Sequence, residues 1–166
     1  MHIAQWPRSR ELLSKLPLKF PWIHLSKRKA KKAIKAFVEG NDVFVSLPTG
    51  YGKSLCYALL PSVFDKKRRL AERTSIAMIV SPLIALMKDQ SSSFTEKGIV
   101  SGYVSDKEST DKETKRKIVK GECQLVHISP EALFLSTEWR RMLSRDHYRE
   151  NLVGFIVDEA HCVRKW

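Results

Sequence analysis

The stretch LPTGYGKS, residues 47–54, follows a short apolar run and precedes a segment of helical character. Gly50 and Gly52 let the chain curl without Cβ clashes, so that several backbone N–H groups can converge on one anion. The start of the following helix adds positive potential at the same place. Lys53 offers an ammonium group to outer phosphates, and Ser54 offers a hydroxyl to Mg²⁺. The stretch therefore predicts a loop that binds a nucleoside triphosphate.

A strict phosphate-binding loop has glycine six positions before its lysine, where this chain has Leu47. The alternative interpretation is a chance GKS sequence in an ordinary turn. The apolar run before the loop and the helical pattern after it favour the phosphate-binding interpretation.

Apolar runs alternate with helical patterns along the rest of the chain. Strands are expected at 42–47, 75–81, 99–104, 124–129 and 152–157. Helices are expected at 26–40, at 53–60 before Pro61, at 83–97, at 107–120 and from Pro130 onward. Nearly continuous apolar strands that alternate with helices predict an α/β fold, with a parallel β-sheet sandwiched by helices. Ligands of such sheets bind at the carboxyl ends of the strands.

The sequence DEAH, residues 158–161, follows the last expected strand directly. Asp158 at the end of a buried strand can hold Mg²⁺ through water. Glu159 can orient the attacking water and accept its proton. The alternative is a polar loop that happens to contain two acids.

Serine residues follow two of the other expected strands. Ser81 and Pro82 come after 75–81, with Lys88 in the helix that follows, and Ser129 comes after 124–129. Serine hydroxyls and helix N-terminal amides suit the phosphates of a nucleic-acid strand. Simple N-capping of the following helices is an equally good interpretation.

The chain of 166 residues carries 30 basic and 18 acidic residues, for a net charge of +12 and a pI near 9.8. A surplus of this size predicts a polyanionic partner such as nucleic acid. The basic residues gather in 27–35 and in 66–69, the second in an expected loop after Pro61. Both runs also fit ordinary solvated surface.

The three cysteines, Cys56, Cys123 and Cys162, form no CxxC pair. They predict neither a disulfide framework nor a zinc knuckle, and they favour a reducing intracellular compartment. No apolar run approaches the ~18 residues of a membrane span, so no membrane partner is expected.

Four motifs resemble, in order and spacing, those of the first RecA-like lobe of RecQ helicases of superfamily 2. They are LPTGYGKSLCYALLP (47–61), SPLIALMKDQ (81–90), HISPEAL (127–133) and VDEAHCVRKW (157–166). The resemblance implies the ATP-binding lobe of a 3′–5′ DNA helicase, which couples ATP hydrolysis to strand separation when joined to a second lobe. It implies ATP and Mg²⁺ as cofactors, DNA with a single-stranded region as partner, and a nuclear location.

The resemblance also assigns roles to individual residues. ATP would contact Thr49, Gly50, Tyr51, Gly52, Lys53 and Ser54. Mg²⁺ would be held by Ser54 and Asp158, and catalysis would use Lys53, Asp158 and Glu159. DNA would contact Ser81, Pro82, Lys88, Ser129 and Trp166, and His161 would couple DNA binding to hydrolysis.

The chain departs from this family at two points. Ala30 stands where the family has the glutamine that reads adenine, and a methyl group cannot form that hydrogen bond. The expected domains are an irregular lead-in at 1–25 and the helicase lobe at 26–166, truncated after DEAH, with no second lobe. Two other functions remain open: a truncated module that binds nucleotide and nucleic acid without turnover, and a nucleotide kinase, in which DEAH and SPLIALMKDQ would have no role.

Overall fold

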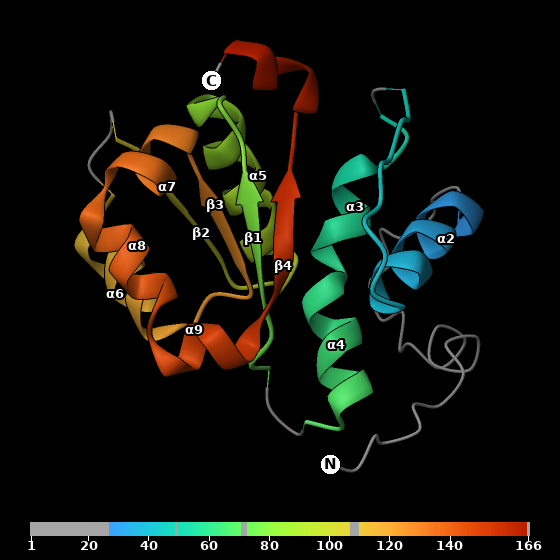
Figure 1. The fold of residues 1–166 in the computed structure, drawn as a ribbon, viewed down its shortest axis with the longest axis horizontal. Helices are drawn as coiled ribbons and strands as arrows, with labels where there is room; N and C mark the ends of the chain where they lie inside the picture. Colours follow the sequence, from blue (N-terminus) through green and yellow to red (C-terminus); the bar gives the residue numbers. More distant parts are fainter. Residues whose placement is uncertain (1–26, 49, 71–72, 107–109, 166) are drawn as a thin grey trace. The chain divides into compact units, whose positions relative to one another are not determined.

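The computed structural model describes residues 27–48, 50–70, 73–106 and 110–165, and Figure 1 shows their helices and strands. The expected lead-in 1–25, Ser26 at the start of the helix expected at 26–40, and the site residues Thr49 and Trp166 lie outside these ranges. The chain forms two compact units, Met1–Ala71 and Glu72–Trp166.

The first unit contains helices α2 (Lys27–Val38), α3 (Lys53–Ala58) and α4 (Leu60–Arg68). The expected amphipathic pattern of α2 is confirmed, because Ala30, Ile34 and Val38 are buried while Lys29, Lys31 and Lys32 are exposed. The helices pack through apolar and polar contacts. The rings of Phe37 and Phe64 meet edge to face at 6.2 Å, and the Lys67 ammonium donates to the Val38 carbonyl at 2.8 Å.

Two expectations for this unit are wrong. Residues 42–47 form no strand, and Phe44 is 85% exposed. A strand needs a hydrogen-bonded neighbour, and the described residues of this unit include no other strand. The helical region also continues past Pro61 to Arg68, because proline in the first turn of α4 removes an N–H that has no partner within the helix. Lys66, Lys67 and Arg68 therefore lie in the last turn of α4 and not in a loop.

The second unit is built on four strands: β1 (Ile76–Val80), β2 (Ser101–Val104), β3 (Leu125–Ile128) and β4 (Leu152–Val157). They form one sheet in the order β2-β3-β1-β4, and every pair is parallel. Each strand lies within the range expected from its apolar run, so the predicted parallel α/β sheet is confirmed.

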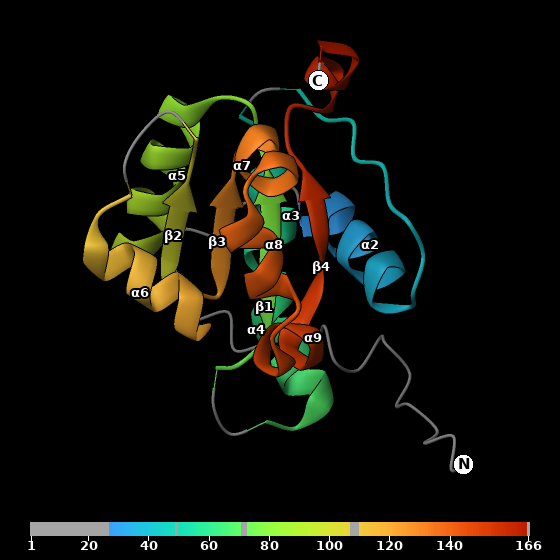
Figure 2. The same cartoon turned by 60° about the vertical axis from the view of Figure 1, so that its left-hand side comes forward.

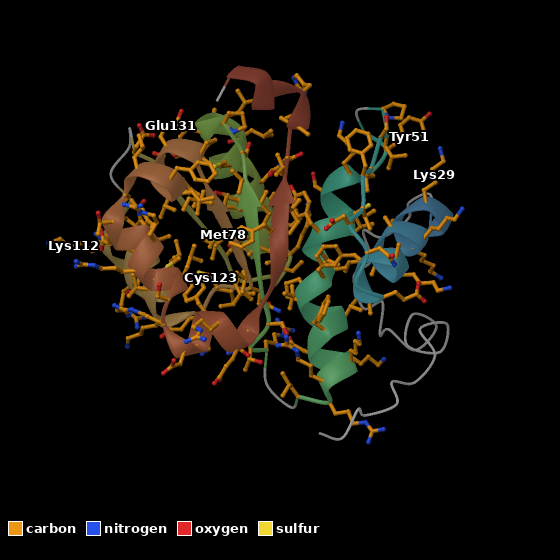
Figure 3. All side chains as sticks on the ribbon, in the orientation of Figure 1. Lys29, Tyr51, Met78, Lys112, Cys123 and Glu131 are labelled. Carbon is orange, nitrogen blue, oxygen red and sulfur yellow. The ribbon has the colours of Figure 1, made fainter. Side chains whose placement is uncertain are left out.

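Helices cover both faces of this sheet (Figures 1 and 2). Helix α5 (Ile84–Glu96) covers one face through Met87 and Phe94, with Phe94 stacked on His127 of β3. The other face is covered by α6 (Lys112–Lys120), α7 (Pro130–Leu135), α8 (Thr137–Leu143) and α9 (Asp146–Asn151). Met78 and Cys123 belong to the core on that side (Figure 3).

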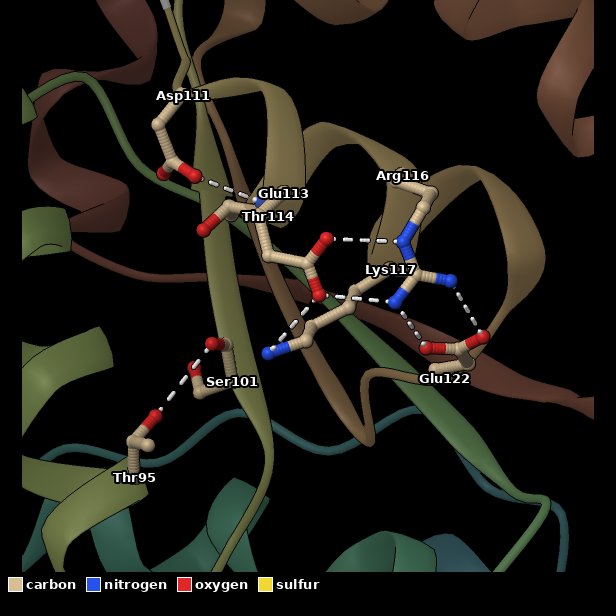
Figure 4. A network of polar contacts seen from close by, with 8 residues as sticks. All are labelled: Thr95, Ser101, Asp111, Glu113, Thr114, Arg116, Lys117 and Glu122. Atoms are coloured by element: carbon tan, nitrogen blue, oxygen red, sulfur yellow. Dashed lines mark hydrogen bonds and ion pairs between the residues drawn. The ribbon is translucent and has the colours of Figure 1, made fainter.

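The polar helix expected at 107–120 is α6, which begins at Lys112. Asp111 caps it by accepting a hydrogen bond from the Thr114 amide at 2.9 Å. On its surface Arg116 pairs with Glu113 at 2.8 Å and with Glu122 at 3.2 Å (Figure 4). These ion pairs explain how so polar a segment remains helical. Helices α8 and α9 were not expected from the sequence.

A 3₁₀ helix, η1 (Ala160–Lys165), follows β4. Across the described ranges, no helix combines the length and the apolar character needed to span a membrane.

Candidate functional site

The loop before α3 has the backbone that its two glycines predict. Gly50 and Gly52 adopt left-handed conformations with φ of 83° and 79°. Between them Tyr51 is 57% exposed (Figure 3), and its amide donates to the Pro48 carbonyl at 3.3 Å. The Leu55 amide donates to the Gly52 carbonyl at 3.1 Å, so the helix starts directly from the loop.

The Lys53 side chain folds back over this loop. Its ammonium donates to the Leu47 carbonyl at 3.3 Å. A neutral carbonyl is a weaker partner for an ammonium group than a phosphate oxygen. A cation already turned onto a glycine loop fits the phosphates of ATP, with Ser54 one position further on for the metal ion.

The second unit brings the other candidates to the carboxyl edge of its sheet. The backbone hydrogen bonds of the sheet continue for one residue beyond the carboxyl ends of β1, β3 and β4. The Ser81 amide donates to the Ile128 carbonyl, the Ser129 amide to Val104, and the Asp158 amide to Val80, at 3.1, 3.1 and 2.9 Å. The expected position directly after a strand is therefore confirmed for these three residues, and their roles in a site stay predictions.

Asp158 is buried, with 8% of its surface exposed, and both of its carboxylate oxygens accept hydrogen bonds. Oδ1 accepts from the Glu159 amide at 3.0 Å, and Oδ2 accepts from the Gln90 side-chain amide at 3.3 Å. Both of these donors are neutral, so they leave the negative charge of the carboxylate in place for a cation or its water ligands. The arrangement fits Mg²⁺.

Glu159 and His161 lie together at the surface beside Asp158. Glu159 has left-handed backbone with φ of 52°, which is rare for a residue other than glycine. Its carboxylate lies 3.2 Å from Nδ1 of His161, whose side chain is 75% exposed. Residues Asp158, Glu159 and His161 of the DEAH motif thus form one local group.

The two serines have different environments. Ser129 accepts a hydrogen bond from the Ala132 amide at 3.1 Å and donates to Asp106 at 3.3 Å, so its interpretation as a helix cap is confirmed. Ser81 is fully buried and caps no helix, because α5 begins at Ile84 with Leu83 in the cap position. Within the described ranges its hydroxyl has no hydrogen-bond partner. Lys88 is exposed on α5 and Pro82 is half-buried; nucleic-acid contact by these residues stays a prediction.

Gln90 and His127 belong to this edge, although the sequence did not single them out as site residues. Gln90 follows the buried Met87 by three residues, a helical spacing that could have placed it on the sheet-facing side. His127 is fully buried, and burial lowers its pKa to about 4, while the nearby charge of Asp158 opposes that shift. It is a core residue of β3.

Cys56, Cys123 and Ala30 are buried in the protein. Cys56 and Cys123 are buried, and burial raises the pKa of both thiols. Cys162 is half-buried. Ala30 packs inward on α2 with 8% exposure.

A model of the DEAD/DEAH box helicase family matches residues 27–166. The chain is 37% identical to the ATP-dependent helicase SGS1 of Saccharomyces cerevisiae over 137 residues, which cover 81% of this chain and 9% of that protein. It is 33% identical to the ATP-dependent DNA helicase hus2/rqh1 of Schizosaccharomyces pombe over 99% of this chain and 12% of that protein.

A bacterial protein is similar over the same region. The ATP-dependent DNA helicase RecQ of Haemophilus influenzae is 31% identical over 139 residues, which cover 82% of this chain and 20% of that protein. The chain thus spans a fifth or less of the length of these relatives.

Proposed function

Because the chain belongs to the DEAD/DEAH box helicase family and its relatives are RecQ-type helicases, we propose that it is the ATP-binding lobe of a RecQ-like 3′–5′ DNA helicase. The observation that carries this proposal is the loop at 47–54, with two left-handed glycines and Lys53 turned back onto the Leu47 carbonyl. The proposed domain is 26–166, preceded by the lead-in 1–25.

In this proposal Thr49, Gly50, Tyr51 and Gly52 surround the phosphates of ATP, and Lys53 replaces its bond to Leu47 with bonds to phosphate oxygens. Ser54 and Asp158 are the residues that would hold Mg²⁺, Asp158 through water. When bound, the ion supplies positive charge to the β- and γ-phosphate oxygens.

Glu159 orients a water molecule and accepts its proton as the water oxygen bonds to the γ-phosphorus and the bond to ADP breaks. Its bond to His161 gives that histidine a route to the base. We propose that DNA contacts at Ser81, Pro82, Lys88, Ser129 and Trp166 act through His161 on this step.

We further propose that strand separation requires a second RecA-like lobe. Lys53 supplies one positive charge, whereas phosphoryl transfer in related enzymes also uses an arginine, worth about 10³–10⁵ in rate. DNA as the substrate, and eukaryotic DNA helicases among the relatives, also support a nuclear location.

The test is a DNA-stimulated ATPase and unwinding assay of the 166-residue chain, alone and with a second lobe supplied in trans. Glu159→Gln is the control, because it keeps the shape of the side chain and removes the base. We expect no unwinding by the chain alone and hydrolysis only with the second lobe. Robust turnover by the chain alone, abolished by Glu159→Gln, would contradict the need for a second lobe. ATP binding without turnover under every condition would favour a binding module.

A further inference from the structure

A side-chain hydrogen bond joins α5 to the residue that follows β4. The Nε2 atom of Gln90 donates to Oδ2 of Asp158 at 3.3 Å, across 68 positions of sequence. Both residues belong to the same unit and lie on the face of the sheet that α5 covers. The bond therefore links the SPLIALMKDQ segment to the DEAH segment.

The rest of Asp158 is already fixed. Its amide continues the sheet ladder to the Val80 carbonyl at 2.9 Å, and Oδ1 accepts from the Glu159 amide at 3.0 Å. Rotation about the Cβ–Cγ bond would break the Oδ1 bond, and a second donor on Oδ2 opposes that rotation. Gln90 is that second donor, so the plane of the carboxylate is set by two bonds of different origin.

Gln90 lies on a part of α5 that is packed on the sheet. It is half-buried and lies between Met87 and Phe94, which are buried, and Ser91 beside it is also buried. The neighbouring Phe94 stacks on His127, and that imidazole is fully buried. The helix backbone that carries the Gln90 amide is therefore held against the sheet next to Asp158.

A neutral donor is the appropriate chemistry at this position. Lysine or arginine at position 90 would neutralise the Asp158 carboxylate and compete with a cation for it. Glutamate at position 90 would repel the Asp158 carboxylate. Glutamine donates one hydrogen bond and leaves the negative charge in place. Residues that hold a metal-binding carboxylate in this way change metal affinity by about 10–100-fold when they are replaced.

We propose that Gln90 is a positioning residue that holds the Asp158 carboxylate in the orientation needed to bind Mg²⁺. This inference rests on the proposed function, because it takes Asp158 as the metal-binding residue. It adds a role for α5 that does not require contact with DNA: the helix sets the geometry of the metal site.

The experiment titrates Mg²⁺ into the 166-residue chain with a fluorescent ATP analogue and records the Mg²⁺ midpoint of nucleotide binding. The same binding is measured in EDTA. Gln90→Met removes the donor and keeps the length of the side chain, and Gln90→Glu keeps the shape and removes the donation. Gln124→Met is the matched control, because Gln124 is 4% exposed and precedes β3, at the opposite end of the sheet. Urea unfolding of each variant reports whether it is folded.

We expect the Mg²⁺ midpoint to rise about tenfold or more in both Gln90 variants, with binding in EDTA unchanged and Gln124→Met like the wild type. A wild-type midpoint in a folded Gln90→Met or Gln90→Glu variant would overturn the role of Gln90 and leave the proposed function intact. Equal rises of the Mg²⁺ midpoint in Gln90→Met and Gln124→Met would also overturn the role of Gln90, because they would indicate a general loss of stability. Nucleotide binding by the wild type that does not depend on Mg²⁺ would instead contradict the proposed function, and this inference with it.

Discussion

Gly121 accepts a hydrogen bond from the imidazole of His147 at 3.3 Å, and the same imidazole occupies the place where a side chain of residue 121 would lie. A Cβ atom there would come within 2.0 Å of Cδ2 of His147. Gly121 also ends α6 with φ of 74°. The contact between His147 of α9 and the end of α6 therefore requires glycine at position 121.

We expect Gly121→Ala to destabilise the protein more than Gly98→Ala does. Both glycines lie just after a helix and have a left-handed backbone conformation themselves. A Cβ at Gly98, however, would meet nothing within 4 Å. Gly98→Ala should cost only the backbone strain, about 1–2 kcal/mol. Gly121→Ala should cost about 1 kcal/mol more, because His147 must turn away and lose its hydrogen bond. Urea unfolding of the two variants measures the difference, and equal losses would contradict the steric role of His147.

The burial of His127 predicts an acid-sensitive component of stability. Burial lowers its pKa in the folded state from 6.5 to about 4. Between these values the unfolded chain binds more protons, so the stabilisation is complete above pH 6.5 and is lost as the pH falls toward 4. The slope from this one group is up to about 1.4 kcal/mol per pH unit.

We expect His127→Phe to reduce the pH dependence of unfolding free energy in that window. Phenylalanine keeps a ring for the stack on Phe94 and has no proton to bind. Measurements at pH 7 and pH 5 on both proteins suffice, because titrations shared by the two proteins cancel in the difference. An unchanged slope would show that His127 is not the group responsible.

Much of the second unit was predictable because its strands are apolar on both faces. Each residue of β1 and β3 is buried, and the sequence runs of these strands are nearly free of polar side chains. Helices α8 and α9 were missed because each is only six or seven residues long and rich in charge. Their few buried residues, Trp139, Met142 and Tyr148, are too sparse to form a periodic pattern.

The failure at 42–47 has a different origin. Val43, Phe44, Val45 and Leu47 favour a strand by composition, but composition carries no information about a hydrogen-bonding neighbour. For Gln90, the helical spacing in the sequence predicts the face of the helix and nothing more. The helical pattern places it toward the sheet, whereas its partner Asp158 is fixed only by the tertiary fold.

For the phosphate loop, we expect Lys53→Ala to weaken ATP binding about tenfold to a hundredfold. The substitution removes a charge-assisted contact worth ~1.5–3 kcal/mol. Equilibrium binding of a fluorescent ATP analogue with Mg²⁺ measures the change. Lys29→Ala, an exposed lysine of the same unit, is the control and should bind like the wild type. Equal affinity of Lys53→Ala and wild type would rule out the loop as the phosphate site.

For nucleic acid, we expect binding to single strands that depends steeply on salt, without sequence preference. The net charge of +12 supports this expectation. The slope of log affinity against log salt should be about −0.7 for each phosphate neutralised. The double substitution of the exposed Lys31 and Lys32 by alanine should reduce the slope, whereas Lys117→Ala, whose lysine pairs with Glu113, should not. A flat salt response would contradict an electrostatic interface.

The extension of the ladder beyond β1, β3 and β4 has a consequence for how the edge behaves over time. The amides of Ser81, Ser129 and Asp158 donate to carbonyls of neighbouring strands. Such protons exchange with deuterium only when the surrounding sheet opens. We therefore expect the amide protons of these three residues, which are proposed to contact phosphate or metal, to exchange slowly like those of the core, although the residues lie at the edge of the sheet. Local opening of loops elsewhere in the unit leaves the bond from the Asp158 amide to the Val80 carbonyl intact, so it does not by itself move Asp158.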